Sequence, residues 1–170
     1  MENLIIQKFG GSSLNSPDKF KACAKHILRA LANGNKLIVV VSAMGDATDE
    51  LLVLAKKLSK APNKRELDML LTTGERASIA LMSICLNELG VKALSLTGSQ
   101  CGILTDSSHT DAQIKDIHPQ RIVEGLVHHD VVVVAGFQGI CPQTKDITTL
   151  GRGGSDLTAV ALAKKLSAKK

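Results

Sequence analysis

Residues 131–139, VVVVAGFQG, join a run of β-branched residues to a turn that contains two glycines. β-Branched side chains favour strands, and this run is the strongest strand signal in the chain. Residues 37–41 form a second run without a polar member, which is typical of a strand covered on both faces. Shorter apolar runs at 4–6 and 91–96 predict two further strands. We therefore expect a sheet that is buried from both sides.

Helical patterns lie between these strands. Ser16 and Pro17 are typical of an N-cap followed by the first helical residue, and apolar residues then recur at helical spacing up to Leu31. A last helix, rich in Ala and Leu, is expected to begin after Ser155 as its N-cap. Three further helices are predicted at 46–59, 64–89 and 119–128.

The alternation of strands and helices predicts an α/β fold with a doubly wound, mainly parallel sheet and helices on both faces. The polar stretch 106–116 is expected to be a short strand or a loop, and 148–155 a glycine-rich loop. Ligands of such sheets gather at the carboxyl ends of the strands. Glycine-containing loops follow the predicted strands after Ile6, Val41 and Ala135.

Composition narrows the classes of partner. The 170 residues correspond to about one domain. Aromatic residues make up only 2% of the chain, which argues against single-stranded nucleic-acid binding because such proteins stack bases on aromatic rings. The net charge is +5, but four of these charges belong to the lysines at 164, 165, 169 and 170. A short basic tail is usually solvated, so no nucleic-acid partner is expected.

No metal site and no membrane partner are expected. The four cysteines, Cys23, Cys85, Cys101 and Cys141, form no C-x-x-C pair, and the histidines lack zinc-ligand spacing. Cys23 and Cys85 are predicted to be small core residues. The start MENLIIQKFGG has an acidic residue at position 2 and a very short apolar run, which is not typical of a signal peptide. No segment approaches the roughly 20 apolar residues of a bilayer span. We expect a soluble, cytoplasmic protein.

Two glycine loops have features of anion-binding sites. Residues 8–13, KFGGSS, follow a predicted strand, and their glycines allow backbone N–H groups to approach an anion. Residues 151–156, GRGGSD, open the last helix, whose free N–H groups favour anions, and Arg152 can grip a carboxylate or phosphate with two parallel hydrogen bonds. Alone, the first loop could be a turn with an exposed lysine and the second a capped turn. A cap, however, gives no reason for an arginine between glycines.

Two further segments give weaker signals. Gly74 lies within or at a break in a helical stretch, where glycine costs roughly 1 kcal/mol relative to Ala, so another constraint is expected to require it. Glu75 and Arg76 could be an exposed charged pair. Residues 42–45, SAMG, with Thr48 form by themselves only a strand-to-helix turn.

Together, in this order, the motifs resemble those of aspartate kinases, within the amino acid kinase superfamily. The motifs are residues 8–13, 41–45 with Thr48, 73–76, 136–139 and 150–158. The resemblance covers the chain up to about Leu166. It implies a phosphotransferase that converts ATP and L-aspartate to ADP and 4-phospho-L-aspartate, the first step towards lysine, threonine and methionine.

The resemblance also implies a role for each motif. Lys8 would neutralise charge on the transferring phosphoryl group and Asp156 would hold Lys8 in place, so that these two are the catalytic residues. Glu75 would meet the substrate ammonium and Arg152 a substrate carboxylate. Magnesium would ride mainly on the phosphates of ATP. ATP would be bound by Lys8, Phe9, Gly10, Gly11 and Ser12. The substrate would be bound by Thr48, Glu75, Phe137, Arg152, Gly153, Gly154 and Ser155.

Aspartate kinases continue beyond the length of this chain, with elements that hold the nucleoside and with regulatory domains. Residues 1–170 are therefore expected to be the N-terminal, amino-acid-binding part, with little or no kinase activity alone. An open sheet edge predicts a homo-oligomer. An alternative is a non-catalytic module of the same fold for ligand sensing or subunit pairing. The presence of Lys8, Glu75, Arg152 and Asp156 favours the enzyme.

Overall fold

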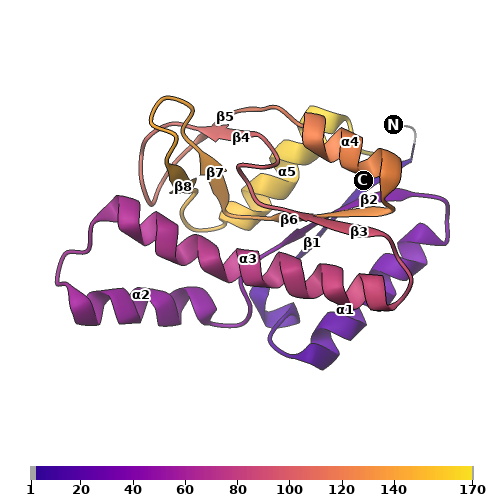
Figure 1. Cartoon of the computed structure of the whole chain (residues 1–170), viewed down its shortest axis with the longest axis horizontal. Coiled ribbons are helices and arrows are strands. Elements are labelled where there is room, and N and C mark those ends of the chain that lie inside the picture. Colours follow the sequence, from indigo (N-terminus) through magenta and orange to yellow (C-terminus); the bar gives the residue numbers. More distant parts are fainter. Residues whose placement is uncertain (1–2, 170) are drawn as a thin grey trace.

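Four parallel strands form the central sheet of the computed structural model, which describes residues 3–169 (Figure 1). Phe9 pairs with Val41 and Val41 pairs with Ala135, so three of the strands end level at one edge of the sheet. The four predicted strands and their parallel arrangement are confirmed. Their spatial order is β1 (Leu4–Phe9), β2 (Lys36–Val41), β6 (Val131–Ala135) and β3 (Ala93–Leu96).

Helices cover both faces of this sheet, as the sequence predicted (Figure 1). On one face lie α1 (Pro17–Leu31) and α3 (Lys64–Glu88), and on the other α4 (Gln120–His128) and α5 (Gly154–Leu166). The helix α2 (Ala47–Leu58) packs mainly against α3. The doubly wound α/β class is therefore confirmed.

The apolar strands divide their side chains between two cores. In β2, Leu37 and Val39 join the core under α1 and α3, whereas Ile38 and Val40 join the core under α4 and α5. The strand β6 alternates in the same way. Both faces are buried, so neither strand shows the polar alternation of a half-exposed strand. Cys23 lies in the first core, as predicted.

The two predicted N-caps had different outcomes. Ser16 accepts a hydrogen bond from the backbone N–H of Lys19 at 3.4 Å, which confirms the start of α1. The prediction that Ser155 caps α5 was wrong. The N-cap of α5 is Gly153, in the left-handed conformation with φ 75°, so the helix begins at Gly154. Ser155 lies in the first turn of the helix and is buried against Gly136. A Cβ added to Gly136 would lie 2.7 Å from Oγ of Ser155.

A second, mixed sheet lies beside the carboxyl edge of the first (Figure 1). Its order is β5 (Ile114–Ile117), β4 (Ile103–Thr105), β7 (Gln138–Ile140) and β8 (Ile147–Thr149). The strands β4 and β7 are parallel, and the two outer pairs are antiparallel. The sequence predicted a turn at 136–139 and a loop from 148, which was wrong for β7 and β8. Strands of three residues are too short to show a hydrophobic period.

The helix α3 is a core helix with an unusual composition. By length and mean composition alone it could cross a membrane. Half of its apolar window is buried inside the protein, where α3 packs on β3, β6 and β8. It also carries two buried carboxylates, Asp68 and Glu75. Since buried charges need specific partners, these two mark the places where α3 holds other segments.

Candidate functional site

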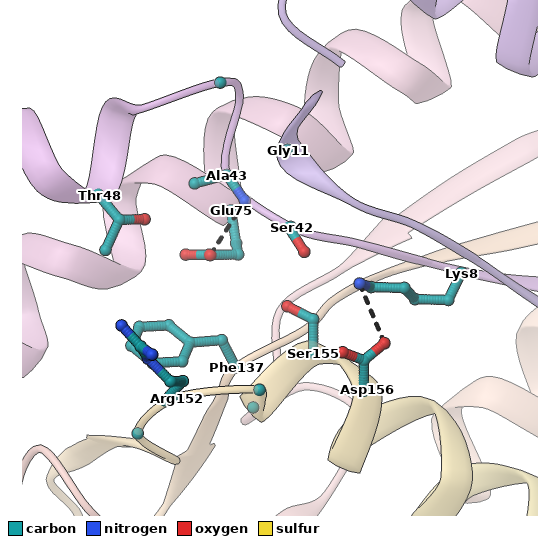
Figure 2. Close-up of a pocket in the computed structure, with 14 residues that line it drawn as sticks. Lys8, Gly11, Ser42, Ala43, Thr48, Glu75, Phe137, Arg152, Ser155 and Asp156 are labelled. Atoms are coloured by element: carbon teal, nitrogen blue, oxygen red, sulfur yellow. Dashed lines mark hydrogen bonds and ion pairs between the residues drawn. The ribbon is translucent and has the colours of Figure 1, made fainter. Parts of the chain in front are cut away.

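A cleft of about 330 Å³ lies at the edge where the parallel strands end. Figure 2 shows Thr48, Glu75 and Ser42 on one wall, with Arg152, Phe137 and Ser155 on the wall that faces it. Its lining comes from segments far apart in the chain: Lys8, Gly11, Ser42, Ala43, Gly45, Thr48, Glu75, Phe137, Gly151, Arg152, Gly153, Gly154, Ser155 and Asp156.

Lys8 and Asp156 form an ion pair at one end of the cleft (Figure 2). The Nζ of Lys8, from β1, lies 3.0 Å from Oδ1 of Asp156, in the first turn of α5. The lysine side chain is 28% exposed and the aspartate side chain 67% exposed, so the pair is open to a ligand. The carboxylate therefore fixes the direction of the ammonium group, while part of that group stays free for an anion.

The glycine loop after β1 packs directly on the loop after β2. Gly11 begins a single 3-10 turn, Gly11–Ser13, and its carbonyl accepts a hydrogen bond from the N–H of Gly45 at 2.9 Å. A Cβ on Gly11 would lie 2.7 Å from the carbonyl oxygen of Ala43. Glycine is therefore required at this position by close backbone contact. The loop needs no left-handed residue there, because only Gly45 in this region has a positive φ, of 49°.

Glu75 is the most deeply buried titratable group of the cleft. Its side chain is 2% exposed, and its Oε1 accepts a hydrogen bond from the N–H of Ala43 at 3.0 Å. Its Oε2 is buried without a hydrogen-bond partner within the described part of the chain. Burial raises the pKa of Glu75 to about 7 from 4.5, although the bond from Ala43 opposes this rise. The exposed charged pair considered for Glu75 and Arg76 is therefore wrong for Glu75.

Gly74 is explained by the same contact region. The helix α3 runs through it without a break, and a Cβ on Gly74 would lie 2.8 Å from the Cβ of Ala43. Glycine here lets α3 approach the end of β2 closely enough for Glu75 to reach the backbone of Ala43. The constraint expected from the sequence is thus a packing constraint.

We expect Gly74→Ala to lower the free energy of unfolding by about 2 kcal/mol, because overpacking outweighs the gain in helix propensity of about 1 kcal/mol. Urea denaturation measures this change. The double variant Ala43→Gly/Gly74→Ala removes the clash and serves as the control. It is expected to be more stable than the sum of the two single changes predicts. Additive single effects would contradict the packing explanation.

The turn before α5 brings Arg152 to the opposite wall. Gly151 and Gly153 are both left-handed, with φ of 72° and 75°, and Arg152 between them is exposed towards the cleft (Figure 2). Gly154 is needed for packing, since a Cβ there would lie 2.8 Å from Cδ2 of Phe137. Phe137 itself has a φ of 69°, which is costly for a residue with a side chain.

Phe137 is held in that conformation by α5. Its N–H donates a hydrogen bond to Oγ1 of Thr158 at 3.2 Å. The hydroxyl of Thr158 donates in turn to the carbonyl of Gly154 at 2.9 Å. Strained residues persist where the surrounding structure over-determines them, often at ligand sites. The observed strain at Phe137 therefore agrees with its place in the cleft lining.

Three of the predicted ATP-binding residues do not line the cleft. Phe9 packs against the first core, and Ser12 lies near the surface, where its carbonyl accepts a hydrogen bond from Nζ of Lys19 at 2.7 Å. Gly10 lies beside the lysine, since an added Cβ would be 3.5 Å from Nζ of Lys8. The predicted substrate-binding residues all line the cleft.

The sequence reasoning assigned no role to four residues that the structure adds to the lining. Ser42, Ala43 and Gly45 belong to a motif that the sequence singled out, but that motif alone indicated only a turn. Gly151 completes the left-handed turn around Arg152. Within residues 3–169, no group of three or more His, Cys, Asp or Glu side chains is placed to hold a metal ion.

Known proteins resemble this chain over nearly its whole length. A family model described as the amino acid kinase family matches residues 3–170. The chain is 52% identical to an aspartokinase of Corynebacterium glutamicum over 97% of its own length, and 53% identical to an aspartokinase of Geobacillus stearothermophilus over 98%. It spans only 39% and 41% of the lengths of these two relatives.

Solved structures resemble the whole chain. The aspartate kinase from Synechocystis superposes with a TM-score of 0.83 and 49% identity, and the match covers 98% of this chain and 27% of that one. Escherichia coli aspartokinase III, solved in complex with aspartate and ADP, superposes with a TM-score of 0.83 over 99% of this chain and 48% of that one. Its identity is 22%, so it supports the fold alone.

Proposed function

Because the chain belongs to the amino acid kinase family, we propose that it forms the acceptor-binding part of an aspartate kinase. Such an enzyme transfers the terminal phosphoryl group of ATP to the side-chain carboxylate of L-aspartate. The proposal is supported by relatives named aspartokinase that are about half identical over nearly all of this chain. We propose that the nucleoside of ATP is bound by a region that corresponds to the parts of those longer relatives that this chain does not match.

The unpartnered oxygen of Glu75 carries the proposal. A buried carboxylate oxygen without a donor is costly, and a ligand ammonium group would supply the missing partner. Arg152 on the facing wall offers a guanidinium, which binds carboxylates with two parallel hydrogen bonds. A cleft with a buried anion on one wall and an arginine on the other is suited to an α-amino acid. Thr48 and Phe137 would close its sides.

Lys8 is the residue that we propose to act in the transfer itself. The acceptor carboxylate is ionised at neutral pH, since the pKa of an aspartate side chain is about 3.9, and it needs no general base. One of its oxygens would form a bond to the γ-phosphorus while the bond from that phosphorus to the bridging oxygen of ADP breaks. The Lys8 ammonium, held by Asp156, would neutralise charge on the phosphoryl oxygens during this exchange.

The donor set fits a magnesium ion that is held mainly by the nucleotide. Asp156 is the exposed carboxylate of the cleft, and it is paired with Lys8, while Glu75 is buried on another wall. Mg²⁺ commonly binds through substrate phosphates and one or two carboxylates, with water completing the shell. When bound, it would neutralise phosphate charge. Asp156 is the residue of this cleft that would reach it.

The homo-oligomer and the cytoplasmic location stay predictions. Among the described residues, β1 and β3 are the edge strands of the parallel sheet. The carbonyl of Leu4, on β1, accepts a hydrogen bond from the N–H of Lys169 at 2.9 Å, so the amino end of that edge is partly covered.

The test is an assay of the complete protein for ADP release with L-aspartate and MgATP. Succinate, which has the same two carboxylates but no ammonium group, is the matched control acceptor. We expect L-aspartate to support turnover and succinate to support little, because only L-aspartate supplies a partner for Glu75. Equal use of both acceptors, or no use of L-aspartate, would refute the proposal.

Arg152→Ala is expected to raise the KM for L-aspartate about 10- to 100-fold and to leave the KM for ATP within about twofold. Loss of a buried charge-assisted contact would cost about 2–5 kcal/mol. The lower end applies because Arg152 is exposed in the free protein. Arg76→Ala, which removes an exposed arginine of α3 outside the cleft lining, is the control. A rise confined to the KM for ATP would assign Arg152 to the nucleotide.

A further inference from the structure

Asp68 is a fully buried carboxylate outside the cleft lining, and it is surrounded by donors. Its Oδ1 accepts a hydrogen bond from the hydroxyl of Thr149 at 2.6 Å. Its Oδ2 accepts one from Nδ1 of His109 at 2.6 Å. The N–H of Thr110 donates to both oxygens, at 3.1 and 3.3 Å. One side chain of α3 therefore ties together β8 and the loop before β5.

The bond to Thr149 leads directly to the cleft. Thr149 is the last residue of β8, and Gly151 and Arg152 follow after one residue. Leu150 between them is fixed by a hydrogen bond from its N–H to the carbonyl of Phe137 at 2.9 Å. The strand β8 packs against α3 (Figure 1). The carboxylate of Asp68 thus contacts β8 at its last residue, shortly before the turn with Arg152.

The hydrogen bonds that Asp68 accepts from His109 and Thr110 hold a loop that lies against the same turn. Thr110 has a φ of 69°, which a threonine adopts only when its surroundings enforce it. The next residue, Asp111, lies against Gly151. A Cβ added to Gly151 would be 2.9 Å from Oδ1 of Asp111 and 3.5 Å from the carbonyl oxygen of Thr110. The loop held by Asp68 is therefore the surface on which Gly151 rests.

Asp68 and Glu75 lie on the same face of α3. Seven residues are almost two helical turns, which place two side chains on one face about 10 Å apart along the axis. Glu75 holds the end of β2 through Ala43, and Asp68 holds the end of β8 through Thr149. One helix therefore contacts a segment of each wall of the cleft.

From this arrangement we infer that Asp68 is a positioning residue: through Thr149 and the loop at 109–111, it fixes the turn that presents Arg152 to the acceptor. Apolar packing alone would not require a charged group here, because burying a carboxylate is costly unless several donors meet it. The inference rests on the proposed function for the identity of the acceptor, but the placement of the turn can be measured without it.

The test compares substitutions at two adjacent threonines of β8. Thr149→Val removes the hydroxyl group that donates a hydrogen bond to Asp68 and keeps the shape of the side chain. Thr149→Ser keeps a hydroxyl group at this position. Thr148→Val is the matched control, since Thr148 is equally buried but bonds Oγ1 of Thr105 at 2.6 Å within the second sheet. Amide hydrogen exchange over 147–156 and the KM values for L-aspartate and ATP are measured in the complete protein.

We expect Thr149→Val to speed exchange in this segment about tenfold relative to Thr148→Val, and to raise the KM for L-aspartate about tenfold with the KM for ATP unchanged. Thr149→Ser should return both values towards those of the parent protein. Equal exchange in the two valine variants would overturn the inference, because a general loss of core bonding would then explain both. If L-aspartate is not a substrate, the exchange result still decides, and only the proposed function fails.

A second pair of variants applies if Thr149→Val does not fold. His109→Ala removes a donor to Asp68 from a side chain that is 18% exposed. His118→Ala removes a histidine that contacts Asp116 at 3.1 Å and is 58% exposed, and it serves as the control. Faster exchange over 147–156 in His109→Ala than in His118→Ala would support the inference, and equal exchange would overturn it.

Discussion

Replacing Lys8 with alanine in the complete protein is expected to lower kcat for L-aspartate phosphorylation about a thousandfold, with a smaller change in the KM for L-aspartate. A preorganised charge on a transferring phosphoryl group acts in the transition state, and removing one such donor commonly costs about 10²–10³ in kcat. The Nζ of Lys8 lies 3.0 Å from Oδ1 of Asp156. No other cation of the cleft lining lies at that position. Steady-state ADP release measures the effect.

Lys19→Ala is the matched control for this experiment. Lys19 contacts the same glycine loop, through the carbonyl of Ser12, but it does not line the cleft. The control removes the same charge, so it corrects for any general change in attraction of ATP. A loss of less than tenfold for Lys8→Ala, or an equal loss for Lys19→Ala, would contradict the assignment of Lys8 to the transferred group.

Glu75→Gln is expected to flatten the pH dependence of stability between about pH 4.5 and 7. Burial raises the pKa of Glu75 to about 7 from 4.5, so in this window the folded protein retains a proton that the unfolded chain loses. The free energy of unfolding therefore falls as the pH rises, by up to about 3 kcal/mol from this group alone. The glutamine carries no such proton. Urea denaturation at pH 5, 6, 7 and 8 measures both slopes.

Glu88→Gln, at the exposed end of the same helix, is expected to leave the slope of the parent protein unchanged. The lowered pKa values of Asp106 and Asp146 affect stability only at lower pH, and they are common to all the variants. The KM for L-aspartate should fall as the pH rises through 7, because only ionised Glu75 attracts the ammonium. Parallel stability slopes for Glu75→Gln and the parent protein would show that the carboxylate is not strained by burial.

The sequence predicted the parallel sheet well because its strands are buried on both faces. Residues 37–41 and 131–135 have no polar member, and such runs are typical of strands in parallel sheets that are covered on both faces. The second sheet was not predicted. Its strands β7 and β8 have three residues each, and they form because Gln138–Ile140 and Ile147–Thr149 pair with each other across a turn. Pairing between short segments leaves no periodic signal.

Most residues of the candidate site were predicted, but the burial of Glu75 was not. Gly74 signalled a constraint, and the motifs named most of the residues that line the cleft. The burial of Glu75 could not be read from its neighbour Arg76, because two adjacent helical residues point in different directions. The hydrogen bonds of Asp68 join segments that are 41 and 81 residues apart. Such contacts depend on the completed fold.

The close contacts of Gly11 and Gly74 with Ala43 limit how the specificity for the acceptor could be redesigned. A methyl group at Gly11 would meet the carbonyl of Ala43, and one at Gly74 would meet its Cβ. Gly11 and Gly74 have no side chain that could adjust, so a library that varies them would mostly yield destabilised proteins. Variation at Thr48, Phe137 and Arg152 changes the shape and charge of the walls instead. Attempts to admit a longer diacid should therefore randomise the walls and keep Gly11, Ala43 and Gly74 fixed.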